Sequence, residues 1–336
     1  MKVIHLLPAL EQGGVETVVC DLVKALEGWE SVVVSKGGRL AERIELMGGR
    51  HVALDLKSKN PLTCLSRMWK LRRILRDEKP DLVCAHSRVP AWLYVGVRAL
   101  DSTVCKIPWI TYAHGANSVS RYSEVMTKGD LVVAPSRFLA DYLKTNYGTR
   151  ESKIRVIPNS VDAARFDPAN LNQMFIAEKR REWGIQEGDH VVMAIGRITP
   201  VKGLDDLIRT TPADVKLVIV GGADRHHLDY ERRLRTMAGK NVVFAGSQEK
   251  VPECISIADE IVSANTTKPE TFGLSIVEAY AMNRPVRVAR RFGGAAEVME
   301  AVEQATCSTL REAVLKLYGL DVFAKRTKAV YRELVG

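Results

Sequence analysis

Residues 260–289 read EIVSANTTKPETFGLSIVEAYAMNRPVRVA, and this stretch predicts a strand, a loop, a helix and a second strand. The apolar runs Glu260 to Ala264 and Pro285 to Ala289 have the length of strands, and an apolar helix of about Leu274 to Met282 lies between them. A helix between two short buried runs is typical of a β-α-β unit, in which the two strands are parallel. The stretch therefore favours an α/β fold.

Short runs rich in valine and isoleucine alternate with helical patterns through the rest of the chain. Buried parallel strands have this appearance, because helices cover both faces of their sheet. The expected strands cover residues 2–7, 31–34, 51–54, 81–85, 109–112, 130–134 and 154–157 in the first half, and 190–195, 215–220, 241–244, 260–264 and 285–289 in the second. Between the halves, residues 158–173 hold prolines, asparagines and no clear period, so we place the domain junction there. We predict two doubly wound parallel-sheet domains in tandem.

The totals agree with a globular protein of two domains. At 336 residues the chain exceeds the usual size of one domain, and 46% hydrophobic with 26% charged residues is average usage. No apolar run has the length of a membrane span, and the stretch MKVIHLLPALEQGG lacks the basic flank and cleavage site of a signal peptide. The net charge of +9 favours an anionic partner, whether nucleic acid, a phosphorylated ligand or a membrane face.

The six cysteines are scattered along the chain and show no C-x-x-C spacing. Most of them lie in apolar runs, as expected of buried reduced thiols. This usage predicts a cytoplasmic protein without structural zinc. The six are Cys20, Cys64, Cys84, Cys105, Cys254 and Cys307.

Two glutamates, Glu270 and Glu278, flank the loop-to-helix turn of the opening stretch. The first turn of a helix carries N–H groups without helical partners and a partial positive charge, so it can hold a phosphate or sugar oxygens. Carboxylates accept hydrogen bonds, and beside such a turn they suit the hydroxyls of a ribose and of a sugar. The plainer interpretation is two solvated charges. Against it, Glu278 stands among Ile276, Val277 and Ala279, where an unpaired carboxylate is costly.

A second constellation is AIGRITPVKGLDDLI, where we expect a strand to end at Gly196 and a helix to begin near Gly203. Arg197 and Lys202 lie in the connecting loop. Glycine permits close approach of the backbone to a ligand, and the two cations can neutralise phosphate charge. Either cation alone would fit an exposed loop, but the order strand, glycine, cation, helix predicts a phosphate site.

Further candidate residues follow strands of the first half. Gly13 and Gly14 open the first helix without the fingerprint of a dinucleotide or P-loop site, and a plain turn explains them as well. His86 and His114 each follow a strand, at the edge where doubly wound sheets bind ligands. A histidine there can hydrogen-bond a sugar hydroxyl or transfer a proton, although a lone histidine after a strand is more often structural.

Residues 57–79 contain eight lysines or arginines and predict a basic amphipathic helix. Four apolar residues form its stripe: Cys64, Met68, Leu71 and Leu75. Such a helix can cover a sheet with a solvated outer face, or it can also lie against an anionic membrane surface. We favour the solvated helix and keep membrane contact as the second interpretation.

Taken together, these stretches resemble the retaining nucleotide-sugar glycosyltransferases of the GT-B fold, family 4. The matching segments are GGVE, HSRVPAW, YAHG, PNSVD, GRITPVKGLDDLI, PETFGLSIVEAYAMNRPV and GGAAEVM, in the family's order. HSRVPAW is loosely similar to enzymes of lipopolysaccharide core assembly. The resemblance implies two Rossmann-like domains with a cleft between them. Residues 1–160 would form the acceptor side, with a helix of about residues 321–336 packing back on it, and residues 161–320 would bind the nucleotide sugar.

The resemblance also implies the reaction. A sugar would pass from a nucleoside diphosphate to an acceptor hydroxyl with its anomeric configuration retained, and without a bound metal or other cofactor. We expect a UDP-sugar as donor and a glycan or lipid-linked acceptor of the cell envelope, such as lipopolysaccharide, with no nucleic acid as partner. The protein would work in the cytoplasm, with residues 57–79 available for contact with the inner face of the membrane.

Individual roles follow from the same resemblance. Arg197 and Lys202 would stabilise the departing diphosphate. Glu278 would hold the ribose and Glu270 the donor sugar, with His114 near the reacting sugar. The remaining donor contacts would be Gly13, Gly14, Gly196, Thr271, Phe272, Gly273 and Leu274, with His86 and Arg88 on the acceptor side and no metal ligand.

Ser160 departs from the family pattern, in which glycine is common at this position. We therefore expect a hinge that is stiffer or differently shaped. Two other functions fit parts of the sequence. A nucleotide-sugar epimerase or phosphorylase could use the same double fold, and an epimerase would convert the free donor without an acceptor. A non-catalytic nucleic-acid-binding protein fits the charge, but 6% aromatic residues and the lack of an RNA-binding signature argue against it.

Overall fold

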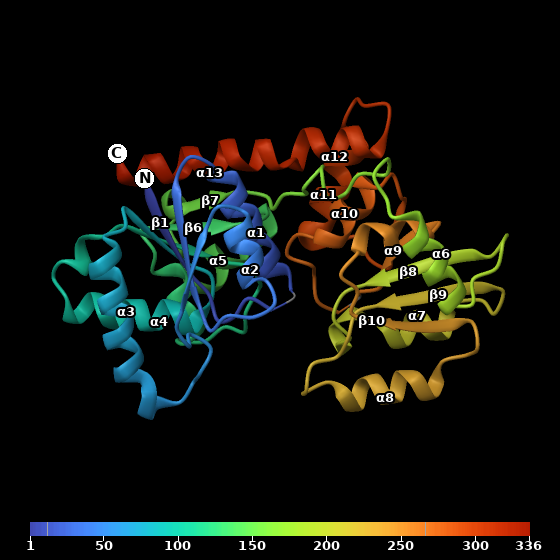
Figure 1. Cartoon of the computed structure of the whole chain (residues 1–336), viewed down its shortest axis with the longest axis horizontal. Coiled ribbons are helices and arrows are strands. Elements are labelled where there is room, and N and C mark those ends of the chain that lie inside the picture. The colour runs from blue at the N-terminus through green and yellow to red at the C-terminus, as the bar shows by residue number, and fades with distance from the viewer. Residues whose placement is uncertain (12, 266) are drawn as a thin grey trace. The chain divides into compact units, whose positions relative to one another are not determined.

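The computed structural model of the protein describes residues 1–11, 13–265 and 267–336 (Figure 1). The chain divides into two compact units. The first consists of Met1–Ser160 together with Leu320–Gly336, and the second of Val161–Gly319. Each unit contains one parallel sheet with helices around it, which confirms the predicted fold class of two doubly wound α/β domains.

The sheet of the first unit has seven parallel strands in the order β3-β2-β1-β4-β5-β6-β7. The strands are β1 (Lys2–Leu6), β2 (Glu30–Ser35), β3 (Arg50–Ala53), β4 (Leu82–Ala85), β5 (Trp109–Tyr112), β6 (Leu131–Ala134) and β7 (Ile154–Val156). The chain winds outward from β1 in one direction and, after crossing back, from β4 in the other. The reversal between β1 and β4 is the topological switch point, where doubly wound sheets form a ligand-binding crevice.

Helices cover both faces of this sheet. They are α1 (Gly14–Ala25), α2 (Ala41–Leu46), α3 (Cys64–Glu78), α4 (Arg88–Leu100), α5 (Arg137–Tyr147) and α13 (Leu320–Val335), with short 3-10 turns η1 (Pro61–Thr63), η2 (Val104–Lys106), η3 (Ser123–Thr127) and η4 (Glu151–Lys153). Leu71, Leu75 and Tyr94 of α3 and α4 share a buried cluster with Ile4 and Leu6 of β1. The burial of this cluster stabilises one face of the sheet.

The last helix, α13, packs against α1 and belongs to the first unit (Figure 1). Tyr331 of α13 is fully buried, and its hydroxyl lies 2.7 Å from the hydroxyl of Tyr112. The Cys84 thiol donates a hydrogen bond of 3.3 Å to the same Tyr331 oxygen. Burial raises the pKa of both tyrosines well above the usual value, so these hydroxyls stay neutral. This hydrogen-bonded triad fixes α13 to strands β4 and β5.

The second unit contains a five-stranded parallel sheet in the order β10-β9-β8-β11-β12. Its strands are β8 (His190–Ile195), β9 (Val215–Val220), β10 (Val242–Gly246), β11 (Glu260–Ser263) and β12 (Val286–Val288). Its helices are α6 (Gln173–Glu182), α7 (Leu204–Thr210), α8 (Leu228–Met237), α9 (Val251–Ile257), α10 (Leu274–Ala281), α11 (Gly293–Gln304) and α12 (Leu310–Tyr318), with a 3-10 turn η5 (Pro200–Lys202). The switch point of this sheet lies between β8 and β11.

The predicted strands are confirmed, with bounds that differ by at most about two residues. The junction stretch 158–173 contains no strand of the sheets and leads from β7 to α6. At this junction Ser160 is buried, and its hydroxyl donates a hydrogen bond of 2.8 Å to Asp21 Oδ2 in α1. A glycine at this position could not make this bond. The serine therefore ties the end of the first unit's chain to its first helix.

The cysteines of the described chain are all free thiols. Cys20, Cys84 and Cys254 are buried as expected, whereas Cys105 is exposed. Among the described residues, none of the helices is both long and apolar enough to span a membrane.

Candidate active site

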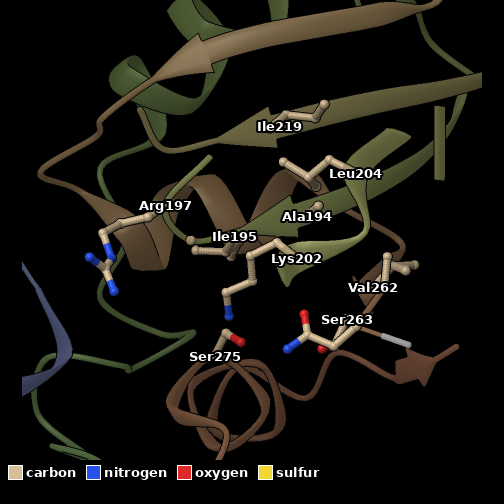
Figure 2. Close-up of a pocket in the computed structure, with 12 residues that line it drawn as sticks. Ala194, Ile195, Arg197, Lys202, Leu204, Ile219, Val262, Ser263 and Ser275 are labelled. Carbon is tan, nitrogen blue, oxygen red and sulfur yellow. The ribbon is translucent and has the colours of Figure 1, made fainter. Parts of the chain in front are cut away.

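A pocket lies at the switch point of the second unit, where the loops after β8 and β11 meet (Figure 2). Its wall consists of Ala194, Ile195, Gly196, Arg197, Lys202, Leu204, Ile219, Val262, Ser263, Ala264, Asn265 and Ser275. The volume is about 20 Å³, which holds one water-sized group. Within the second unit, this pocket can therefore take a phosphate oxygen or a hydroxyl, but not a whole nucleotide.

Lys202 ends the η5 turn and points into the pocket (Figure 2). Its position depends on Gly203, which has a left-handed backbone with φ of +63°. A Cβ at residue 203 would collide with the carbonyl oxygen of Ala264, so only glycine lets the loop lie this close to the end of β11. The Lys202 ammonium forms an ion pair with Glu270 Oε1, across 68 residues of sequence.

Asn265 also contacts Glu270, and it was not predicted from the sequence. Its Nδ2 donates a hydrogen bond of 3.2 Å to Glu270 Oε1. A carboxylate only accepts hydrogen bonds, so this contact fixes which end of the amide faces Glu270. The other end, Oδ1, is buried and has no hydrogen-bond partner among the described residues. An asparagine two residues beyond a strand looks like a turn residue, so its sequence context gave no signal.

The N-terminus of α10 borders the same pocket through Ser275 of its first turn. Gly273 precedes the helix with φ of +99° and gives it no side-chain cap. The first N–H groups of an uncapped helix need partners from elsewhere, and they attract anions. The first turn of α10 thus borders the same pocket as Lys202, and phosphate binding there stays a prediction.

Other residues in and just before this helix that were predicted to contact the donor do not line the pocket. Phe272 is buried in the core, where its ring packs edge-on against Tyr318 with centroids 5.6 Å apart. Leu274 is half-buried and packs against the same core. Glu278 is half-buried in α10, and Thr271 is half-buried before it. The Phe272 side chain is therefore not available to a ligand.

Arg197 is exposed, although it forms part of the pocket wall. Its side chain extends in a direction different from that of Lys202 (Figure 2). Of the two predicted cations, Lys202 is the one that the structure places at the pocket's polar groups.

In the first unit, Gly14 begins α1 and Gly13 stands as its N-cap with an extended backbone. The Thr17 hydroxyl donates a hydrogen bond of 3.1 Å to the Gly13 carbonyl oxygen. Glu16 occupies the first turn of the helix. The two glycines follow β1 and open the first helix, as predicted, and β1 is one of the two strands at the switch point of its sheet.

His86 and His114 belong to a row of three hydrogen-bonded histidines, and sequence reasoning missed the third. His86 Nδ1 lies 3.0 Å from His114 Nε2, and His5 Nδ1 of β1 lies 3.1 Å from His86 Nε2. The Tyr112 ring stacks on His86, with centroids 4.7 Å apart. We call His5, His86 and His114 the histidine chain.

Burial determines the charge of these rings. His5 is fully buried, and desolvation lowers its pKa to about 3. Desolvation likewise lowers the pKa of the half-buried His114 to about 4 and that of His86 well below the usual value. The neighbouring rings act on His86 in the same direction. All three rings are therefore neutral at pH 7.

The two residues predicted on the acceptor side, His86 and Arg88, differ in how far their side chains are exposed. His86 is only 2% exposed and lies beneath other rings, so its side chain offers no open surface to an acceptor. Arg88, the first residue of α4, is half-buried. It donates a hydrogen bond of 3.1 Å to the Ser123 hydroxyl and lies over the Tyr122 ring.

The helix predicted within residues 57–79 is α3, but several of its arginines are bonded to other groups of the protein. Arg67 is buried and donates hydrogen bonds to the backbone carbonyls of Ser58, Asn60 and Thr63. Arg72 and Arg76 both bond the buried carboxylate of Asp101, at 2.6 and 2.7 Å. The count of eight cations thus overstates the basic surface of this helix. Lys57, Lys59, Lys70 and Arg73 are exposed.

No group of three or more His, Cys, Asp or Glu side chains within the described ranges is arranged to hold a metal ion.

Family models match both units of the chain. The model described as Glycosyltransferase Family 4 matches residues 12–165, and the model described as Glycosyl transferases group 1 matches residues 175–310. The chain belongs to the GT-B glycosyltransferases of the family 4 type. The fold predicted from the resemblance is thereby confirmed, because the two models and the two parallel sheets agree.

Curated relatives of this glycosyltransferase are distant. It is 27% identical, over 69% of its length, to an uncharacterized glycosyltransferase of Methanocaldococcus jannaschii, and the match spans 63% of that protein. It is 26% identical to a GDP-mannose-dependent phosphatidylinositol monomannoside mannosyltransferase of Corynebacterium glutamicum, over 91% of this chain and 85% of the relative.

Among solved structures, this glycosyltransferase is similar to Anabaena HepE, which was crystallised in complex with UDP and glucose. The TM-score is 0.79 with 20% identity, and the match covers 99% of this chain and all of HepE. At this identity the likeness concerns the fold alone.

Proposed function

We propose that this protein is a retaining glycosyltransferase that moves a hexose from a UDP-sugar to an acceptor hydroxyl of a cell-envelope glycan, of the kind found in lipopolysaccharide. The observation that carries the proposal is the pocket at the β8–β11 switch point. There Lys202, which is ion-paired with Glu270, and Ser275 of the first turn of α10 line a space of phosphate-oxygen size. The Lys202 ammonium and the N-terminus of α10 can bind a phosphate, and the Glu270 carboxylate can accept hydrogen bonds from sugar hydroxyls.

Lys202 has the central role in the proposed reaction. Without donor, its charge is compensated by Glu270. A diphosphate with one oxygen in the pocket offers the ammonium a second anion, and negative charge on the diphosphate grows as the bond to the sugar breaks. Lys202 therefore binds more strongly to the transition state than to the intact donor. Arg197, from the same loop, adds positive charge from the outer side of the site.

Glu270 is proposed to hold the donor sugar. Its contacts to Lys202 and Asn265 are both made through Oε1, so within the described residues Oε2 is left to accept from a sugar hydroxyl. Glu278, further along α10, is proposed to hold the ribose. Departure of a stabilised diphosphate on the face that the acceptor then uses accounts for retention without an enzymic nucleophile. In this proposal the cations of the protein serve the leaving group, with no metal ion or other cofactor.

The proposal also specifies the nucleotide of the donor, UDP. It is supported by Anabaena HepE, which shares the fold and holds UDP with glucose. The corynebacterial relative uses GDP-mannose, so GDP is the alternative base.

Nucleotide binding provides a direct test. We expect UDP at about 100 times its dissociation constant to stabilise the second unit by about 2.7 kcal/mol and to raise its melting temperature by about 5 to 10 °C. Thermal shift with UDP, GDP, ADP and uridine, each at equal concentration, measures this. Uridine is the control, because it lacks the diphosphate that Lys202 is proposed to bind.

The outcomes separate the parts of the proposal. A larger shift with GDP or ADP would keep the nucleotide-sugar site and overturn the choice of UDP. Absence of a shift with all three diphosphates at millimolar concentration would overturn the site itself. An equal shift with uridine and UDP would show that the proposed contacts to the diphosphate contribute nothing to binding.

Contact with the membrane is proposed through α3. Leu62, Leu65 and Trp69 are 90%, 74% and 59% exposed, and we call them the outer patch. The exposed cations Lys57, Lys59, Lys70 and Arg73 lie before and after these residues in the sequence. Exposed leucines and a tryptophan flanked by lysine and arginine suit insertion into the interface of an anionic membrane. A lipid-linked acceptor on the cytoplasmic face would then lie near the enzyme.

Vesicle binding tests the outer patch. We expect vesicles rich in phosphatidylglycerol to retain the protein at low salt, and Leu65→Ser or Trp69→Ser to weaken binding about tenfold, because each change removes apolar area that enters the lipid. Co-sedimentation measures the bound fraction. Leu46→Ser is the matched control, since Leu46 is 83% exposed and belongs to another helix, α2. Failure of the unchanged protein to sediment with these vesicles would refute the membrane contact.

A further inference from the structure

The carboxylate of Glu270 is held by two donors of different kinds. Lys202 forms an ion pair with its Oε1. Asn265, two residues beyond β11, donates a hydrogen bond of 3.2 Å from Nδ2 to the same oxygen. Asn265 is only 5% exposed. One charged donor and one neutral, buried donor of the second unit therefore fix the position of Oε1.

These two donors respond differently to an anion. Lys202 points into the pocket (Figure 2), its side chain is 29% exposed, and its ammonium ends a flexible four-carbon stem. An anion in the pocket competes with Glu270 for that charge. Asn265 lines the pocket as well, but its amide has no net charge and its side chain is buried. Asn265 is therefore the contact of Glu270 that a bound diphosphate disturbs least.

The main chain of Glu270 is held separately, by the start of α11. The Gly294 N–H donates a hydrogen bond of 2.8 Å to the Glu270 carbonyl oxygen, and Gly293 forms a parallel β-bridge with Glu270. A Cβ at Gly293 would lie 2.5 Å from the Pro269 Cβ, and one at Gly294 would overlap the Thr271 carbonyl. The glycine pair of GGAAEVM therefore lets α11 lie against the loop that carries Glu270.

The other end of the Asn265 amide lowers the stability of the fold. Its Oδ1 is buried and has no hydrogen-bond partner among the described residues. An unpaired buried acceptor is destabilising. Leucine has the same number of side-chain heavy atoms and would avoid this penalty, but it could not donate to Glu270. The contact with Glu270, and not the packing of the fold, therefore accounts for an asparagine at this position.

We propose that Asn265 is a positioning residue that keeps the Glu270 carboxylate aligned for the donor sugar while Lys202 binds the diphosphate. With Oε1 held by Asn265 and the main chain held by Gly294, Oε2 is the oxygen that accepts from a sugar hydroxyl. The Glu270 side chain is 23% exposed, so a ligand can reach it. The contact of Glu270 with the sugar rests on the proposed function, whereas its contact with Asn265 is part of the structure.

Calorimetric titration of Asn265→Leu with UDP-glucose and with UDP tests this role. We expect UDP-glucose to bind about tenfold more weakly than to the unchanged protein, and UDP to change by less than about twofold. The reason is that only UDP-glucose carries the sugar that Glu270 would hold. The melting temperature of the variant should not fall, because the unpaired Oδ1 is removed. If the thermal-shift series selects GDP, GDP-mannose and GDP replace the two probes.

Two comparisons separate positioning from other roles. Asn241→Leu is the matched control, since the Asn241 amide donates bonds of 2.9 Å to the backbone carbonyls of Pro212 and Val215. It should lower the melting temperature and leave both affinities unchanged. In a protein that already carries Glu270→Ala, we expect Asn265→Leu to change UDP-glucose binding by less than about twofold, because the residue through which it acts is gone. A further tenfold loss there would overturn the positioning role.

A second variant keeps the test open if leucine prevents folding. Asn265→Asp preserves the shape of the side chain, but an ionised carboxylate cannot donate to Glu270, so UDP-glucose binding should weaken at least as much. A folded variant of either kind that binds UDP-glucose normally, or that loses UDP and UDP-glucose equally, would overturn the inference. An unchanged protein that binds none of these nucleotides would instead refute the proposed function.

Discussion

Lys202→Ala is expected to lower the rate of nucleoside diphosphate release from a donor sugar by about 100- to 1,000-fold. The reason is that the ammonium stabilises charge that develops as the diphosphate departs, and alanine supplies none. The Michaelis constant for the donor should change less than the turnover number, because the loss is greatest in the transition state. Turnover under saturating donor, measured as release of the diphosphate, reports the effect.

Two further variants separate the causes of that loss. Lys240→Ala removes an exposed lysine of the same unit and should leave the rate unchanged. Lys202→Ala also leaves Glu270 without its cation. The double variant Lys202→Ala with Glu270→Gln removes that uncompensated charge. If the double variant recovered most of the rate, repulsion from Glu270 and not loss of the cation would be responsible. A single variant with near-normal turnover would contradict the site.

Acid is expected to destabilise the first unit between about pH 6.5 and pH 3. The pKa of His5 is about 3 in the folded protein, below the value of 6.5 that an unfolded histidine has. Below pH 6.5 the unfolded chain binds a proton that the folded chain does not, so stability falls as pH falls and levels off near pH 3. For His5 alone the loss is about 2 kcal/mol at pH 5 relative to pH 7. His86 and His114, whose pKa values are also lowered, add to it in the same direction.

Urea unfolding at a series of pH values measures this dependence. His5→Phe should make the decline between pH 7 and pH 5 shallower, whatever it does to stability at pH 7. His226→Gln is the control for removing a histidine from an exposed position. An equally steep decline in His5→Phe would mean that His5 does not remain neutral on folding.

The sheets could be predicted because buried parallel strands are apolar on both faces and therefore form continuous runs. The loop Arg197 to Lys202 could also be predicted, since a strand, a glycine, two cations and a helix follow one another directly. The contact between Lys202 and Glu270 depends on β8 and β11 being neighbours. Both residues follow strand ends, so the rule that ligand-binding loops gather at the switch point places them together once the strand order is known.

The residues that were missed lack a local signal. His5 lies inside an apolar run and looks like part of an ordinary strand. Its contact with His86, 81 residues later, follows only from the pairing of β1 with β4. Asn265 looks like a loop residue, and its role depends on Glu270 across the turn. The charge of α3 was overestimated for the same reason, because Asp101 neutralises two of its arginines from another part of the chain.

The return of α13 to the first unit bears on how the protein is made. A ribosome releases residues 161–319 before it releases α13, although that helix completes the packing of the first unit. Until then Tyr112 and Cys84 lack Tyr331, and part of the first sheet remains uncovered. The second unit is continuous in sequence and can fold while synthesis proceeds. The unit that is translated first is therefore the one that reaches its native packing last.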